Sequence, residues 1–526
     1  MRAALIPLLT AALAGAALAD PPKKPLFGRH KAVGAATAAT PLPSAPTVPP
    51  TGPPPLAAPP IRPADVPITM VDVPPGTTDV PPAAPARTML VMPDTALIDS
   101  PAPAGPTAPP TLAQLRAAYA FALPVYELMR TRQVEVTRTE ALGAPGVNHL
   151  YARTTLPNAT TRDGTTPNTD TLVSSGWLDL AGGPVILDAP ALPGRYHSVA
   201  LIDLFTDNVA IVGTRSGGRG GRYLIAGPGW TGTVPPGLSL LRSPTNDAWL
   251  LVRVLVNGPA DLPAATGLIR GFSLEVPADH AKPVPVAAVP TTVPDAATFL
   301  AVIDEALARN PLPPATRARP ELAALGLGHP DSGATLAAWA KALPTLRAEV
   351  KGGLAAGGTT VDGWTYPDPN IGEYGDGNDA GRARVALGGL GALPATEAIT
   401  LTATTDAAHA PLTGATAYTV HIPGRLPVTG FWSLTMYRAE ADGRLVLVDT
   451  PSKRFAVGDR SDLHPERDGG FDIFVQTTEP SGERVVNWLP APKALFRLIF
   501  RAYRPGPAFL DGSFRLPPVT VSEAVP

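Results

Sequence analysis

The chain has 526 residues, a formal net charge of −2, 16% charged residues and no cysteine. The missing cysteine excludes disulfides, cysteine zinc sites, thiolate nucleophiles and iron–sulfur clusters, and the near-neutral charge without a basic cluster argues against nucleic acid as a partner. Glycine, alanine and proline take the place of charged residues, which is typical of a loop-rich β protein.

Residues 1–19 have the pattern of a secretory signal peptide. Arg2 supplies the positive start, Ala3 to Leu18 is small and apolar, and Ala17-Leu18-Ala19 fits the small-x-small cleavage rule. The apolar stretch is too short and too rich in alanine for a spanning helix. We therefore expect a periplasmic or secreted protein with no membrane span after signal cleavage.

Residues 20–110 are predicted to be a disordered, proline-rich tether. They hold 26 of the 67 prolines in the chain. Such a segment samples polyproline II and cannot bury enough apolar area to offset its ordering entropy. A plain spacer and a specific proline-rich ligand site both fit this composition, which specifies only stiffness.

Residues 111–280 are predicted to form an N-terminal β-rich domain with a leading helix. Thr111 and Gln114 make a capping box, apolar spacing continues the helix to about Arg132, and Pro124 should kink it. Short alternating runs between Gly, Pro and Asp clusters then predict the strands Val147–Thr154, Thr171–Asp179, Val185–Leu187, Tyr196–Leu204, Val209–Thr214, Gly221–Ile225, Leu238–Arg242 and Trp249–Leu255.

Residues 281–377 are predicted to be a helical connection, and residues 378–526 a C-terminal β-sandwich. Helical spacing covers Asp295–Arg309 and Leu336–Lys351. The fold class is thus mainly β with helical segments: two β-sandwich, jelly-roll-like domains joined by a helical connection. In the second domain we expect the strands Tyr418–Ile422, Gly430–Tyr437, Leu445–Asp449 and Phe471–Gln476, a hairpin turn at Ala441–Arg444 and a short helix over Lys493–Tyr503.

One polar constellation stands out as a candidate site. Asp170 follows a Pro-Asn-Thr turn that would place its carboxylate at the mouth of a strand, and Arg195 is a planar cation suited to a carboxylate or phosphate. Asp170 and Asp203 could be a catalytic carboxylate pair, one raising the pKa of the other. The candidates for substrate binding are His149, Asn168, Arg195, Tyr196 and Trp488.

The same residues also admit a structural interpretation. An Asn or Asp before a strand is ordinary Asx-turn chemistry, and Arg195 could pair with Asp179 or Asp203 to close the sheet. Trp488 could stack a sugar or an aromatic ligand, or lie buried in a rigid turn. The scattered histidines show no metal-ligand spacing, so we predict no metal residue and leave the cofactor open.

Two sets of motifs resemble a pair of exported bacterial domains. The stretch from about Thr111 to Ile269 resembles domain of unknown function 1254 through Asn168…Asp170, Trp177-Leu-Asp-Leu180, Gly194-Arg195-Tyr196, Asp203, the Gly227-Pro-Gly-Trp230 turn and Arg253. The stretch from about Asn378 to Val519 resembles domain of unknown function 1214 through Asp406, the Phe431–Tyr437 strand, Asn487–Pro492, Arg501-Ala-Tyr503 and Asp511-Gly512. The resemblance implies an exported tandem β-sandwich protein. Val173 and Phe455 stand where these families commonly have tyrosine.

Two functions fit these observations. The first is an exported enzyme of unassigned reaction that acts on a small polar or amphipathic molecule in an inter-domain or sandwich pocket, with Asp170 as acid and base and Arg195 as anchor. The alternative is a non-catalytic ligand-binding or assembly protein of the cell envelope, whose glycine-rich and apolar strand edges would pair into a homo-oligomer. The two differ in whether Asp170, Arg195 and Asp203 meet at an open pocket or lie buried in ion pairs.

Overall fold

A computed structural model describes residues 109–522 apart from 163–165, 284, 311, 313, 329–332, 354–356 and 441–443. The expected signal peptide, nearly all of the expected tether and residues 441–443 of the expected hairpin turn lie outside the described residues. The described residues belong to one compact unit. In this part of the chain, no helix is long and apolar enough to cross a membrane.

The N-terminal half is a β-sandwich. One sheet has the order β1-β2-β8-β4-β5 and the other has the order β7-β6-β3-β9. Leu178 and Val252 from the first sheet and Leu187 from the second lie in one buried core between the two sheets. The strands are β1 Tyr151–Ala152, β2 Thr171–Asp179, β3 Val185–Ala189, β4 His197–Ile202, β5 Asn208–Gly213, β6 Gly221–Ala226, β7 Ser239–Arg242, β8 Asp247–Leu255 and β9 Ser273–Glu275.

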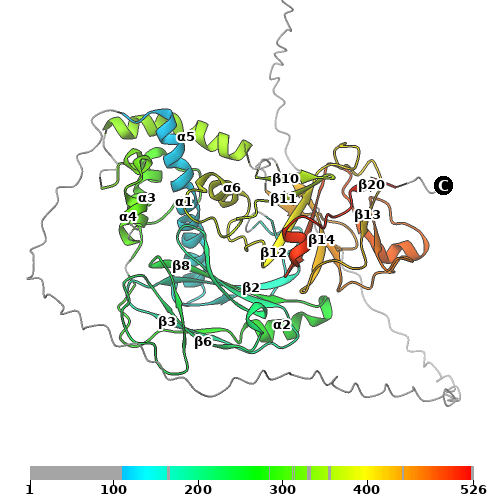
Figure 1. Ribbon diagram of the computed structural model, residues 1–526, viewed down its shortest axis with the longest axis horizontal. Coiled ribbons are helices and arrows are strands. Elements are labelled where there is room, and N and C mark those ends of the chain that lie inside the picture. The colour runs from blue at the N-terminus through cyan, green and yellow to red at the C-terminus, as the bar shows by residue number, and fades with distance from the viewer. Residues whose placement is uncertain are drawn as a thin grey trace, which may run out of the picture. The chain divides into compact units, whose positions relative to one another are not determined.

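Helices cover the other face of the β2–β8 sheet (Figure 1). Trp177 and Trp249 pair in register with rings 5.0 Å apart, and they share a buried core with Phe299 of α3 and Trp339 of α5. The capping box at Thr111 is present, but α1 continues nine residues beyond the predicted end, with Glu135 and Arg138 paired on its surface. The helices are α1 Leu112–Ala141, α2 Leu262–Ile269, α3 Ala296–Arg309, α4 Pro314–Arg317, α5 Gly333–Gly352 and α6 Asp379–Gly388.

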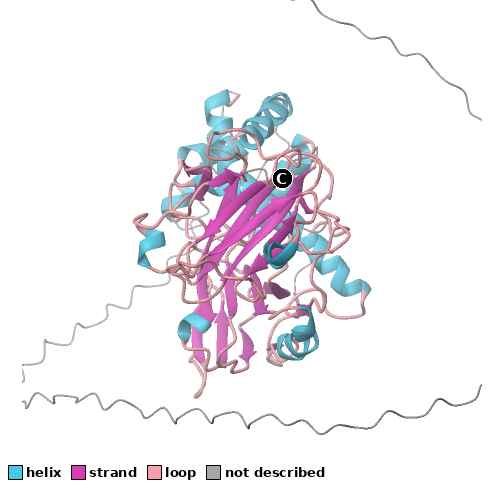
Figure 2. Cartoon of the chain, turned by 90° about the vertical axis from the view of Figure 1, so that its right-hand side faces the viewer, coloured by secondary structure: helices cyan, strands magenta, loops and turns pink. Residues whose placement is uncertain are grey.

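The C-terminal half is a second β-sandwich, which faces the viewer in Figure 2. Its larger sheet has the order β10-β11-β12-β19-β14-β15, with β16 also paired to β14, and its smaller sheet has the order β18-β17-β13-β20. The elements are β10 Gly358–Val361, β11 Trp364–Pro367, β12 Ala398–Ala403, β13 Tyr418–Ile422, β14 Trp432–Ala439, β15 Leu445–Leu447, β16 Ala456–Gly458, β17 Phe471–Gln476, β18 Trp488–Pro490, β19 Arg497–Tyr503, β20 Val519–Val521 and the short helix α7 Pro507–Leu510.

The short helix predicted over Lys493–Tyr503 is wrong. Residues 497–503 form β19, a central strand that pairs with β12 on one side and β14 on the other. Leu498 and Phe500 lie in the core between the two sheets, while Arg501 and Tyr503 lie on the opposite face. That opposite face meets the N-terminal half and forms the junction described next.

Candidate functional site

Asp170 lies at a junction between the two sandwiches. Its side chain is buried at 3% exposure, although it comes from the turn before β2. Oδ2 accepts a hydrogen bond from the Ser433 hydroxyl at 2.6 Å, and Oδ1 lies 2.7 Å from Arg460 Nη2. Both oxygens are therefore bound by residues of the C-terminal half.

Asn168 and Tyr196 make further contacts across the junction. Asn168 Oδ1 accepts from the Asp170 amide, the expected Asx turn, while its Nδ2 donates to the Tyr503 hydroxyl at 2.6 Å. The Tyr196 hydroxyl donates to Glu397 Oε1 at 2.8 Å. Asn168, Asp170 and Tyr196 are thus brought together by the fold, as contacts between halves that are far apart in sequence.

Arg195 does not join this cluster. Its Nη2 donates to Asp261 Oδ1 at 2.8 Å, and its Nη1 donates to Asp261 Oδ2 and to the Leu255 carbonyl. The pairing that we expected with Asp179 or Asp203 is therefore wrong, because the start of α2 supplies the carboxylate instead. This bidentate contact occupies the guanidinium and ties α2 to the edge of the β-sheet.

Asp203 lies far from Asp170. Thr171, next to Asp170, pairs with Leu255, whereas Ile202, next to Asp203, pairs with Trp249. Six residues of β8 separate these positions, about 20 Å at the rise of a strand. The expected carboxylate pair is therefore not formed.

Asp203 instead caps its own turn. Its Oδ1 accepts from the amides of Phe205 and Asp207. Burial, with the nearby Asp207 charge adding to it, raises the pKa of Asp203 to about 7. Asp207 itself pairs with Arg382 at 2.7 Å.

The two remaining predicted site residues also lie outside the junction. The half-buried His149 side chain makes no hydrogen bond or ion pair with any described residue. The Trp488 indole donates to the Gln476 carbonyl at 2.9 Å, and Asn487 is buried and bound to His464 and Asp472 backbone carbonyls. Among the described residues, no group of three histidine or acidic side chains could hold a metal ion.

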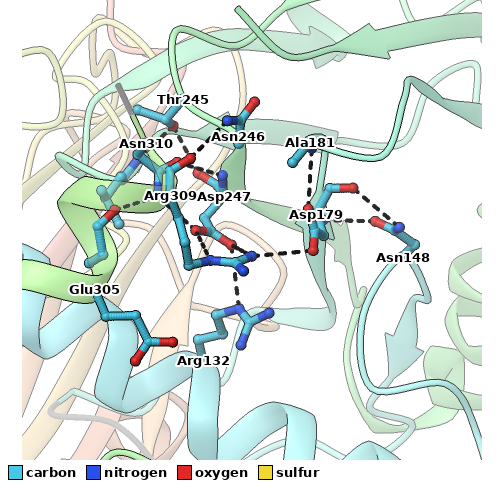
Figure 3. A network of polar contacts seen from close by, with 12 residues as sticks. Arg132, Asn148, Asp179, Ala181, Thr245, Asn246, Asp247, Glu305, Arg309 and Asn310 are labelled. Atoms are coloured by element: carbon cyan, nitrogen blue, oxygen red, sulfur yellow. Dashed lines mark hydrogen bonds and ion pairs between the residues drawn. The ribbon is translucent and has the colours of Figure 1, made fainter. Parts of the chain in front are cut away.

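A second buried network pairs arginines with carboxylates (Figure 3). Asp179 and Asp247 lie directly opposite each other on β2 and β8. Arg309 Nη2 lies 3.2 Å from the first carboxylate and 3.0 Å from the second, and Arg132 Nε lies 3.8 Å from Asp247. Asn310 donates to Asp247 at 2.7 Å. Each arginine in this network has a carboxylate partner.

Arg253 on β8 is different. Its Nη2 donates to the Gly391 carbonyl at 3.1 Å, but its buried Nη1 has no hydrogen-bond partner. Among the described residues, no carboxylate lies within ion-pair distance of this guanidinium. A buried N–H group without an acceptor is costly, so a native structure that keeps one usually has an acceptor for it.

Donors surround Arg253 on the face of the sheet that meets the C-terminal half. The fully buried Ser198 lies directly opposite it on β4, and Val173 lies opposite it on β2. Two residues before Val173, the buried Thr171 hydroxyl has no partner. Alternate residues of neighbouring strands share one face, so these donors lie in one small patch.

Tyrosines complete the junction as protonated groups. Burial raises the pKa of Tyr503, with the Asp170 charge adding to it and the Arg501 and Arg253 charges opposing it. Burial also raises the pKa of Tyr196 and of Tyr437. Because Tyr503 accepts a hydrogen bond from Asn168, its own proton is available to a further acceptor.

The junction carries an excess of positive charge. Arg460 pairs with Asp170 and Asp459, and Arg215 and Arg504 pair with Glu397. Buried Arg501 bonds to the Tyr437 and Thr435 hydroxyls, and Arg253 bonds only to a carbonyl. Among the described residues, five arginines thus meet three carboxylates here, which favours an anion.

The chain segments on both sides of the junction match protein families of unknown function. Residues 147–276 match "Protein of unknown function (DUF1254)" and residues 397–507 match "Protein of unknown function (DUF1214)". The chain therefore carries matches to the two domain families in tandem. The DUF1254 match contains Asp170 and Arg253, and the DUF1214 match contains Glu397, Arg460 and Tyr503. The junction is therefore built from both halves of the tandem.

This chain has the fold of a solved protein. It is similar to the VPA0106 protein from Vibrio parahaemolyticus, with a TM-score of 0.59 and 21% identity over 78% of this chain and 100% of that one. A putative uncharacterized protein from Burkholderia cenocepacia matches with a TM-score of 0.40 and 11% identity, over 77% of this chain and 89% of that one. No curated protein matches.

Arg253 is part of the DUF1254 resemblance but was not predicted as a site residue, although the sequence carries a signal for it. It is the single charged residue within the apolar run Ala248–Leu255. A lone arginine in a strand buried on both faces must be paired or functional, since burying a charge is costly. Arg501, inside Leu498–Tyr503, carries the same signal.

Proposed function

We propose that this protein is an exported, non-catalytic binding protein that holds a small carboxylate-bearing molecule at the junction between its two sandwiches. The observation that carries the proposal is the buried Arg253 Nη1, which has neither a hydrogen-bond acceptor nor a neighbouring carboxylate. A carboxylate oxygen would satisfy Arg253, and the Thr171 and Tyr503 hydroxyls could donate to the same group. The signal-like N-terminus supports the export part of the proposal.

Binding is better supported than catalysis because the acidic candidates are occupied. Both Asp170 oxygens are bound, by Ser433 and Arg460. Asp203 caps a turn about 20 Å away along the strand direction. An acid–base group must reach the substrate proton, and either residue would first have to leave these contacts.

The test compares carboxylate binding in two arginine variants. Isothermal titration with acetate and propionate should detect binding to the full chain, and Arg253→Met should weaken it at least tenfold. Arg222→Met is the matched control, because Arg222 lies on the exposed face of β6 beside Glu275. Native mass spectrometry of protein purified from its own periplasm should show a small retained acid in the wild type.

Equal binding by wild type and Arg253→Met would overturn the proposal, as would a wild-type chain that neither binds acetate nor retains a ligand. In either case ordered water would be the acceptor at Arg253. The expected homo-oligomer remains a prediction, and sedimentation velocity at micromolar concentration tests it. A monomer at every concentration would remove it.

A further inference from the structure

A separate small pocket opens at one end of the C-terminal sandwich. It has a volume of about 160 Å³ and lies where β13 ends, β14 and β17 begin and Asp459 follows β16. Ile422 pairs with Phe471, and Ser433 pairs with Gly458, so the pocket lies between the edges of the two sheets. Its walls come from the C-terminal half alone.

The side chains that line this pocket are mostly apolar or aromatic, although polar atoms make up the larger part of its exposed wall. Trp432 and Phe471 lie with ring centroids 6.3 Å apart, and Leu426 and Val428 line the pocket beside them. Gly424, which also lines the pocket, allows a close backbone approach, because a Cβ there would lie 2.3 Å from the Gly469 carbonyl oxygen. An enclosed volume of about 150 Å³ is enough to hold benzene, so this pocket fits a group of that size.

One charged residue, Asp459, lines this pocket. Asp459 is the single titratable residue of the pocket wall, and its side chain is 35% exposed. Its Oδ1 lies 2.7 Å from Arg460 Nη1. Burial raises the pKa of Asp459, with Arg460 opposing this, so a second cation at the carboxylate would further stabilise its charged form.

We propose that this pocket binds a small protonated amine with a compact hydrocarbon body. The ammonium group would lie at Asp459, and the hydrocarbon would lie against Trp432 and Phe471. A carboxylate beside aromatic faces is complementary to such a cation in both charge and shape.

The nearby arginine does not make this an anion site. Arg460 donates through Nη2 to Asp170 and through Nη1 to Asp459 and the Trp432 carbonyl. Its guanidinium also lies 4.5 Å from the Phe431 ring centroid. Arg460 is therefore committed to the junction, and Asp459 presents the charge that a ligand in the pocket would meet.

The experiment uses three probes of equal size on the full chain. Titrations at pH 7.5 with benzylamine, benzyl alcohol and benzoate separate positive, neutral and negative ligands. We expect benzylamine to bind at least tenfold more tightly than benzyl alcohol. Asp459→Asn should remove that preference, and Leu426→Trp should fill the pocket and abolish binding of all three.

The control variant keeps this proposal separate from the carboxylate site. Arg253→Met, a change outside the wall of this pocket, should leave benzylamine binding unchanged. Failure of benzylamine to bind, equal affinities for benzylamine and benzyl alcohol, or an undiminished preference in Asp459→Asn would each overturn the amine site. None of those results would alter the acetate test.

Discussion

Asp170 lies 2.7 Å from Arg460 although 290 residues separate them in sequence. The pair joins the turn before β2 to the loop after β16, and the Ser433 hydroxyl occupies the second carboxylate oxygen. Asp170, which the sequence marks as a catalytic candidate, thus holds the two sandwiches against each other. Four predictions about charged residues follow from contacts of this kind.

Asp170→Asn should lower the free energy of unfolding by about 3 kcal/mol, because it removes the buried carboxylate that binds Arg460 and leaves that partly buried guanidinium with Asp459. Urea denaturation at pH 7 measures the change. Asp449→Asn is the matched control, since Asp449 pairs with Lys453 on the exposed surface and should cost less than about 1 kcal/mol. Equal effects of the two variants would mean that the junction pair adds nothing to stability.

Asp203 should make stability fall as the pH rises. Its pKa is raised to about 7 in the folded chain, whereas an unfolded aspartate titrates near 4, so between these values the folded state holds a proton that the unfolded state has lost. By linkage, the free energy of unfolding falls by up to about 4 kcal/mol as the pH rises from 4 towards 7. The loss is nearly complete at pH 7, and this stability does not return at higher pH. Thermal unfolding from pH 4 to 8 should show this fall in the wild type and a flatter curve in Asp203→Asn. Parallel curves would contradict the assignment.

Arg309→Met should destabilise the chain by about 3 to 5 kcal/mol, because Asp179 and Asp247 would then face each other with only Arg132 near them. Adding Asp179→Asn to this variant should recover part of the loss, since one of the two facing charges is removed. Chemical denaturation of the single and double variants measures the coupling. Arg116→Met, at an exposed pair with Glu349, provides the control.

Arg195→Met should reduce stability without changing ligand binding. The guanidinium is fully engaged by Asp261 and the Leu255 carbonyl, so its loss frees the start of α2 rather than a ligand anchor. Titration with acetate and a melting curve on the same preparation separate the two roles. A normal melting temperature with lost acetate binding would restore the anchor role first inferred from the sequence.

Much of the fold was predictable because most strands alternate or are bounded by turns. The prediction Thr171–Asp179 coincides with β2, and the other N-terminal strands differ from their predictions mainly at the ends. β19 was mistaken for a helix because Leu498–Tyr503 is a short, nearly continuous apolar run, in which periodicity cannot separate a buried strand from a helix.

The site was less predictable because its contacts are non-local. Asn168 and Asp170, which the sequence marked as site candidates, lie at the junction, but their partners Tyr503 and Arg460 come from the other half of the chain. Asp261 follows a glycine–proline turn and gives no sign that it will bind Arg195. Charge pairing across sheets depends on the three-dimensional arrangement, which local patterns do not encode.

The buried contacts of Tyr196 with Glu397 and of Asn168 with Tyr503 mean that neither half has a self-sufficient surface. Produced alone, each half would present unpaired charges and phenols to water beside a large apolar face. A chain cut between β9 and α3 should instead stay associated, as two fragments that complement each other on mixing. We therefore expect the two segments to occur together in one protein, because neither is complete without the other.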